Sequence, residues 1–291
     1  MELVNLLTED GLKLNGFLYK SNTDTKDIIL SVHGMGSNCL RTKEIRISKV
    51  ANNNGIDYYG FNNRGSEIAR YAKKKVNGVK EKILLGTAFE DPLDGYYDIV
   101  AAITKLKALG YKNIYLQGHS LGCTKILYTY KRLKEENSEL IESIKGFILL
   151  SLVDISRVTK TALGDKFNYY LNIAEEKEKR GELTDLMPSE SFLHRMSVKT
   201  YLRYMRDYKE IDTDDYRIVK DIEKPIFMRW GTENEAIIYK PEELVEKVSN
   251  YITGVPKDIG YIDGANHSYN SYEIELANQI MKFIKNMQEN N

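Results

Sequence analysis

The sequence has few cysteines and no long apolar run, and each shortage excludes a class of protein. Cys39 and Cys123 are the only cysteines among 291 residues, too few for a disulfide framework or a four-ligand zinc site. Both are expected to be small buried hydrophobic residues. No stretch approaches the ~20 apolar residues that a helix needs to span a bilayer.

The chain also lacks an excess of charge of either sign. It carries 42 Lys and Arg against 42 Asp and Glu, so no global field recruits nucleic acid or an anionic membrane, and neither partner is expected. The run Lys73–Lys75 is interpreted as a solvated face. Residues 1–5 lack the basic and apolar regions of a secretory signal, and we expect a soluble cytoplasmic protein.

Apolar patterning favours alternating strands and helices. This alternation implies a parallel sheet with right-handed crossovers. The segment 66–92 shows no regular pattern and is interpreted as an irregular connection. The predicted strands are 3–7 and 12–19 as a hairpin, 27–32, 56–61, 113–117, 144–153, 225–230 and 259–262, and the predicted helices are 45–53, 94–109, 123–128, one opening at 241, and 274–284.

The alternation stops between Asp154 and Glu223. Residues 154–223 read as a helical cap, with helices at 166–180 and 197–208, inserted into a core of residues 1–153 and 224–291. His194 is interpreted as a surface or packing residue. The tyrosines of this region either line an aromatic substrate cleft or, as base rates favour, pack against neighbouring elements; they are Tyr169, Tyr170, Tyr201, Tyr204, Tyr208 and Tyr216.

The stretch Gly118-His119-Ser120-Leu121-Gly122 joins a predicted strand to a predicted helix. A nucleophile on a strained strand-to-helix turn needs neighbours without a Cβ where backbones crowd together. The Ser120 hydroxyl would then lie at the positive end of the following helix, with the Leu121 N–H directed at a forming oxyanion. The motif alone equally fits a tight turn that carries an ordinary serine.

Two further loops follow predicted strands. His33-Gly34-Met35-Gly36 has neither G-x-G-x-x-G nor a Walker lysine, so a nucleotide site is not expected, and Met35 N–H is the candidate second oxyanion donor. His33 is interpreted as a structural residue. His267 follows the last predicted strand, giving the chain order Ser, acid, His.

On these landmarks the chain resembles the α/β-hydrolase superfamily over nearly its whole length. Two further landmarks of that superfamily are Trp230-Gly231-Thr232 after a late strand and Gly264-Ala265-Asn266-His267 before the last helix. It looks most similar to the capped serine hydrolases described as esterase-like or serine-aminopeptidase-like. The resemblance implies an α/β fold with a mostly parallel central sheet flanked by helices, a helical cap after the sixth strand, and a serine hydrolase without metal or organic cofactor.

The catalytic acid is where the chain departs from the superfamily. An Asp usually stands three residues after the glycine that closes the late strand, but that position is Asn234. A neutral amide does not stabilise an imidazolium as a carboxylate does. Glu235 is therefore the favoured acid, with Glu233 and Asp154 as alternatives.

The predicted chemistry is acyl transfer. Ser120 attacks a carbonyl of a small-molecule acyl substrate, His267 acts as general base and then acid, Glu235 fixes its tautomer, and the Met35 and Leu121 amides hold the oxyanion. An ester is the expected substrate; amide, peptide or carbon–carbon hydrolysis and acyl transfer to another acceptor use the same triad. A serine at position 120 argues against dehalogenase and epoxide-hydrolase chemistry. The rival from another class is a binding protein that keeps the fold without the chemistry.

Overall fold

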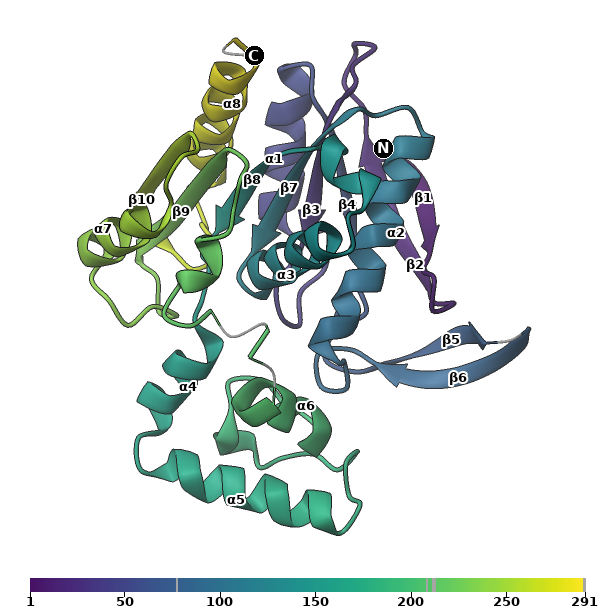
Figure 1. Cartoon of the computed structure of the whole chain (residues 1–291), viewed down its shortest axis with the longest axis vertical. Coiled ribbons are helices and arrows are strands. Elements are labelled where there is room, and N and C mark those ends of the chain that lie inside the picture. The colour runs from purple at the N-terminus through teal and green to yellow at the C-terminus, as the bar shows by residue number, and fades with distance from the viewer. Residues whose placement is uncertain (77, 208, 211–212, 290–291) are drawn as a thin grey trace.

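The computed structural model describes residues 1–76, 78–207, 209–210 and 213–289, and an eight-stranded sheet lies at its centre (Figure 1). The strand order is β1-β2-β4-β3-β7-β8-β9-β10. β2 is antiparallel to β1 and β4, and the other neighbours are parallel. The strands are β1 (Glu2–Leu7), β2 (Lys13–Tyr19), β3 (Asp27–Val32), β4 (Asp57–Phe61), β7 (Asn113–His119), β8 (Ile144–Leu150), β9 (Ile226–Glu233) and β10 (Lys257–Asn266).

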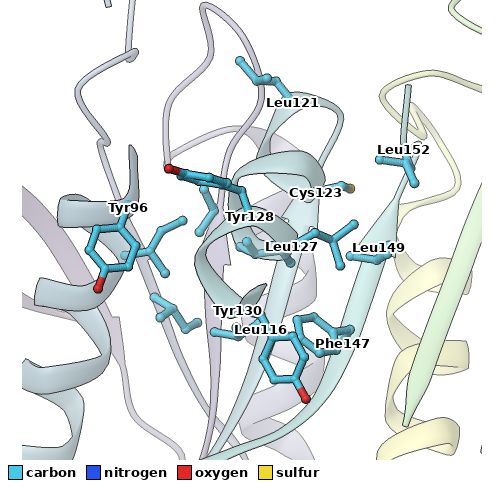
Figure 2. Close-up of a cluster of buried hydrophobic side chains, with 14 of the residues drawn as sticks. Tyr96, Leu116, Leu121, Cys123, Leu127, Tyr128, Tyr130, Phe147, Leu149 and Leu152 are labelled. Carbon is cyan, nitrogen blue, oxygen red and sulfur yellow. The ribbon is translucent and has the colours of Figure 1, made fainter. Parts of the chain in front are cut away.

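Helices cover both faces of this sheet, which is why the central strands are apolar on both sides. α1 and α8 pack on one face, and α2, α3 and α7 on the other. Figure 2 shows part of the second interface, where Tyr128 and Leu127 of α3 lie near Tyr96 of α2 and Leu149 of β8. The bounds are α1 (Thr42–Asn53), α2 (Gly95–Ala108), α3 (Leu121–Glu135), α7 (Pro241–Tyr251) and α8 (Glu273–Glu289). The predicted fold class, a mostly parallel sheet flanked by helices, is confirmed.

A helical segment connects β8 to β9 and lies beyond one end of the sheet, the lower end in Figure 1. Hydrogen bonds join the start of α6 (Val198–Leu202) to the loop before α2: Ser197 N–H donates to Ala88 O at 2.7 Å, and Thr200 Oγ1 donates to Glu90 O at 3.0 Å. Glu90 is buried in a 2.6 Å ion pair with Lys125 of α3. The segment contains α4 (Ile155–Leu163), α5 (Lys166–Lys179), α6 (Val198–Leu202) and a π-helix (Arg203–Asp207).

Most tyrosines of this segment serve packing. Tyr201 and Tyr216 are fully buried, and Tyr170 and Tyr204 are nearly so. Tyr169 is exposed and stacks edge-on against Tyr170, whereas Tyr208 lies outside the described residues.

The segment 66–92 is more regular than its sequence indicates. It forms a two-stranded antiparallel ribbon of β5 (Arg70–Val76) and β6 (Val79–Leu85), which projects from the body in Figure 1. The usual alternation of apolar and polar residues is missing because charged residues stand on both faces of the ribbon, Lys73 and Lys75 on one and Lys74 and Glu81 on the other. No helix within the described residues is both long and apolar enough to cross a membrane.

Candidate active site

Ser120 occupies the junction of β7 and α3 in a strained conformation, with φ 53° and ψ −124°. Such a positive φ is uncommon for a residue with a side chain and turns the hydroxyl away from the sheet. The flanking glycines make the turn possible. A Cβ at Gly118 would lie 2.5 Å from Cys123 N, and one at Gly122 would lie 2.1 Å from Val32 O. The predicted strand–turn–helix arrangement is present.

The loop after β3 runs directly against this turn. A Cβ at Gly34 would lie 2.9 Å from Ser120 Cβ, so only glycine fits there. Met35 follows, and within the described residues its N–H donates to no backbone carbonyl. Leu121 is the first residue of α3, so its N–H has no partner within the helix. Both predicted oxyanion donors are therefore free amides near the serine.

His33 holds this loop, as its structural interpretation predicted. Its ring is buried, with Nδ1–H donating to Gly34 O at 2.9 Å and Nε2 accepting from Asn63 N–H at 3.2 Å. Burial lowers the pKa of His33 to about 3. The ring is consequently neutral, which these two bonds require.

His267 follows β10, and its backbone is fixed from the side of the strand-to-helix turn at residues 118–122, the nucleophile elbow. His119 Nε2–H donates to His267 O at 2.9 Å, and Ser151 Oγ lies 3.0 Å from the same oxygen. Ser120 and His267 line one cavity. Within the described residues their side chains are not hydrogen-bonded to each other.

The ring of His267 is oriented by an amide. Its Nδ1 lies 3.0 Å from Asn234 Oδ1, and that oxygen also accepts from Ala236 N–H at 3.0 Å. Ala236 N–H requires an acceptor, so it fixes which end of the amide faces the histidine. Nδ1 therefore carries the proton, and Nε2 keeps its lone pair for use as a base.

A family model described as "Protein of unknown function (DUF1749)" matches residues 95–286, which include the elbow, the Asn234 loop and His267. The chain belongs to the DUF1749 family. No curated protein matches it.

Solved structures show the fold of this DUF1749 protein to be that of the α/β-hydrolases. Est1E from Butyrivibrio proteoclasticus with bound ferulic acid has 16% identity and a TM-score of 0.69, covering 98% of this chain and 99% of that one. The α/β-hydrolase GrgF from Penicillium sp. sh18 has 16% identity and a TM-score of 0.71, covering 98% of both chains. Mouse α/β-hydrolase domain-containing protein 10 has 15% identity and a TM-score of 0.61, covering 100% and 99%.

The predicted contact of Glu235 with the histidine ring is wrong. The exposed Glu235 side chain accepts from the backbone N–H of His267 at 3.3 Å, while Asn234 occupies the place beside Nδ1. The reason is the backbone course: β9 ends at Glu233 and a turn follows at Glu235, which leaves Asn234 buried and its two neighbours exposed. Glu233, the first alternative, is accordingly exposed.

Asp154, the second alternative, has a structural role. Its Oδ1 caps α4 by accepting from Arg157 N–H at 3.0 Å, and its Oδ2 accepts from Asp215 N–H at 3.1 Å. Both oxygens are thus used within the segment that connects β8 and β9. Among the described residues, no carboxylate bonds the ring of His267 in this DUF1749 protein.

Electrostatics keep this ring neutral. Burial lowers the pKa of His267 to about 4, with Lys43 lowering it further and the Glu235 carboxylate opposing the shift. Lys43 lines the cavity and forms a 3.0 Å ion pair with Glu44; both side chains are buried. Burial also holds the pKa of His119 well below its usual value. His267 is therefore neutral, and able to accept a proton, throughout the neutral pH range.

The cavity above Ser120 has a volume of about 960 Å³. The β3 loop forms one wall, and the segment between β8 and β9 supplies a mostly apolar second wall. His194 also lines the cavity, a position that nothing in the sequence indicated, whereas none of the described tyrosines of that segment does. The apolar wall consists of Val153, Ile155, Val158, Ala162, Leu163, Phe192 and Leu193.

Three residues that hold the site were missed from sequence. His119 and Ser151 fix the carbonyl of His267, and Asn234 fixes its ring. A signal existed for Asn234, because the superfamily places its acid at that position. His119 lies inside the elbow motif, but nothing in the motif indicates that its side chain reaches the loop after β10.

Proposed function

We propose that this protein is a serine hydrolase that cleaves a carboxylic ester through an acyl-enzyme. The observation that carries the proposal is the pairing of two features in one cavity: Ser120 at a positive φ, and His267 with Nδ1 committed to Asn234. A serine in a strained elbow and a histidine held in its basic tautomer are what covalent acyl transfer requires.

In the first step Ser120 Oγ attacks the ester carbonyl while Nε2 of His267 takes its proton. The tetrahedral oxyanion would lie against the amides of Met35 and Leu121, which have no competing partner in the described backbone. The imidazolium then protonates the leaving alcohol, and the carbon–oxygen bond breaks. Water, deprotonated by the same nitrogen, hydrolyses the acyl-enzyme and restores Ser120.

Asn234 changes the energetics of these steps and leaves their order as it is. The amide oxygen orients the ring, but it offers the imidazolium a dipole where related enzymes offer a full charge. The Glu235 carboxylate raises the pKa of His267 by Coulombic attraction, although it bonds the backbone N–H of that residue and not the ring. We expect a competent but slow base that needs an activated or well-bound ester.

The apolar wall supports an acyl group of moderate size, because it faces Ser120 across the cavity. We propose that residues 154–223 act as a cap that selects this group, chiefly through α4 and Phe192. The ferulic acid bound to the neighbour Est1E makes hydroxycinnamoyl esters a reasonable member of a substrate panel.

A panel of soluble esters tests the proposal. Purified protein would be assayed with acetyl, butyryl, octanoyl and feruloyl esters of a chromogenic alcohol, beside Ser120→Ala. Loss of a covalent nucleophile is expected to lower kcat by roughly three orders of magnitude or more with an unchanged circular dichroism spectrum. Equal turnover by both proteins would refute it.

A second candidate, a binding protein without turnover, is favoured by one observation only, the neutral residue beside His267. It predicts no hydrolysis of any ester, together with tight retention of an acyl ligand in the cavity. Amide, peptide or carbon–carbon hydrolysis and acyl transfer to another acceptor share the proposed triad, and matched amide and diketone substrates or added alcohol acceptors distinguish them.

A further inference from the structure

The ribbon of β5 and β6 carries a concentrated positive charge. Residues 70–85 contain six basic side chains against the single acid Glu81, in a chain whose total charge is +0. The rest of the molecule therefore carries a matching negative charge. The neutral total that argues against an anionic partner hides a strongly polarised distribution.

The lysines are sorted onto one face by the strand register. Lys73 stands opposite Lys82, and Lys75 opposite Lys80, so two like-charged pairs share the outward face with Tyr71. Lys74 points to the other side, where its Nζ meets Asp10 at 2.9 Å. All four outward lysines are exposed, and none forms an ion pair with a described carboxylate.

This arrangement costs stability, since like charges directly opposite each other on paired strands repel. Nothing in the packing of the ribbon requires it, because the contacts to the core come from the inward residues Ala72 and Ile83. A surface that is unfavourable for the free protein and useless for its core has the properties of a binding face.

We infer that this face binds the surface of an anionic lipid bilayer. Clustered lysines are attracted to the negative potential of such a surface. The same face exposes Tyr71 (65%), and Lys82 Nζ lies 3.8 Å from the centre of its ring. Tyrosine favours the headgroup region of a bilayer, where lysine ammonium groups beside the ring meet anionic lipid headgroups at the same depth.

The base of the ribbon is joined to the candidate active site. Glu67 N–H, just before β5, donates to Ser37 O at 3.3 Å, and Ser37 lines the cavity that contains Ser120. Lys75 N–H donates to Gly11 O at 2.9 Å, which fixes the ribbon against the turn between β1 and β2. A bilayer bound by the outward lysines would therefore lie at a fixed orientation relative to the cavity.

Vesicle sedimentation tests the inference and does not depend on the proposed function, because binding is measured without a substrate. The wild-type chain is expected to sediment with equimolar phosphatidylglycerol and phosphatidylcholine vesicles at low salt, to stay in solution with phosphatidylcholine alone, and to be released by 0.5 M NaCl. Replacing the four outward lysines by glutamine (K73Q, K75Q, K80Q and K82Q together) is expected to weaken partitioning by about fivefold per lysine.

Two controls separate lipid binding from folding and from general charge. The fourfold variant should keep or raise its Tm, since it removes the repelling pairs. Lys282→Gln with Lys285→Gln removes two exposed charges from α8, away from the ribbon, and should leave binding unchanged. Tyr71→Ser keeps the charge and should weaken binding to vesicles but not to heparin.

Three results would overturn the inference. These are a wild-type chain that ignores anionic vesicles, a fourfold variant that binds them as well as wild type, and binding to duplex DNA or RNA without binding to vesicles. Hydrolysis of soluble esters with no vesicle binding would overturn this inference alone and leave the proposed function standing. Vesicle binding without ester turnover would overturn the proposed function and leave this inference standing.

Discussion

Asn234→Asp is the substitution that reveals most about this site, because it replaces one atom beside the ring of His267. The amide oxygen lies 3.0 Å from Nδ1. A full negative charge within about 4–6 Å typically raises a histidine pKa by about 1–3 units. Starting from a pKa of about 4, the variant's His267 would titrate at roughly 5–7.

The same charge should accelerate the reaction. A carboxylate stabilises the imidazolium that forms as Ser120 attacks, and each unit of pKa corresponds to about tenfold in that stabilisation. We expect kcat to rise by roughly ten- to a thousandfold at pH 8. Stability should fall, because Asn234 Nδ2 is buried without a hydrogen-bond partner and a carboxylate oxygen in its place would lack a donor.

The assay is the pH dependence of kcat/KM for a chromogenic ester between pH 4 and 9. Wild type should reach its plateau by about pH 5, one unit above the pKa of about 4 of the free base. The variant's midpoint should lie higher and its plateau should be faster. An unchanged midpoint together with an unchanged plateau would refute the assignment of Asn234 as the partner of His267.

Three further outcomes are expected. Glu235→Gln should lower the His267 pKa slightly and reduce kcat by less than about tenfold, since the carboxylate acts through space; a thousandfold loss in a kinetic assay would restore Glu235 as the triad acid. Val158→Trp should narrow the cavity and shift the ester panel toward short acyl chains, whereas Thr161→Trp on the same helix should not, because Val158 lines the cavity and Thr161 does not; equal shifts would contradict the role of α4. The free energy of unfolding should fall by about 2 kcal/mol for His33 between pH 7 and pH 5, with His119 adding a fall of the same sign, because their folded pKa values lie below the unfolded value of about 6.5 and the unfolded chain takes up the protons; urea titrations showing no fall over this range would disprove it.

The strands of the eight-stranded sheet, the helices that cover it and the elbow were predictable because their signals are local, whereas β5, β6 and α4 were not predicted. Doubly buried strands read as apolar runs, and Gly118 and Gly122 mark a turn that no other residue can make. The first turn of α1 was missed because Lys43 and Glu44 look like solvated charges, yet they form a buried ion pair. The burial of this ion pair depends on residues that are distant in sequence and form the cavity wall, so the local sequence does not predict it.

The partner of His267 was not predictable with the same certainty, because it depends on a single residue of register. Whether position 233, 234 or 235 faces the histidine is set by where β9 ends, at Glu233, and by the bond from Ala236 N–H that orients the amide. A preference for charge over amide pointed to Glu235. The course of the backbone after β9 instead places the side chain of Asn234 beside the ring of His267.

Intact-mass measurement after exposure to a fluorophosphonate tests directly whether Ser120 is a nucleophile activated by His267. We expect one adduct per chain, mapped by peptide sequencing to Ser120, with labelling slowed strongly in His267→Ala and abolished in Ser120→Ala. An unchanged mass after long incubation of the wild-type chain, or an adduct on any other residue at the same rate in all three proteins, would contradict it.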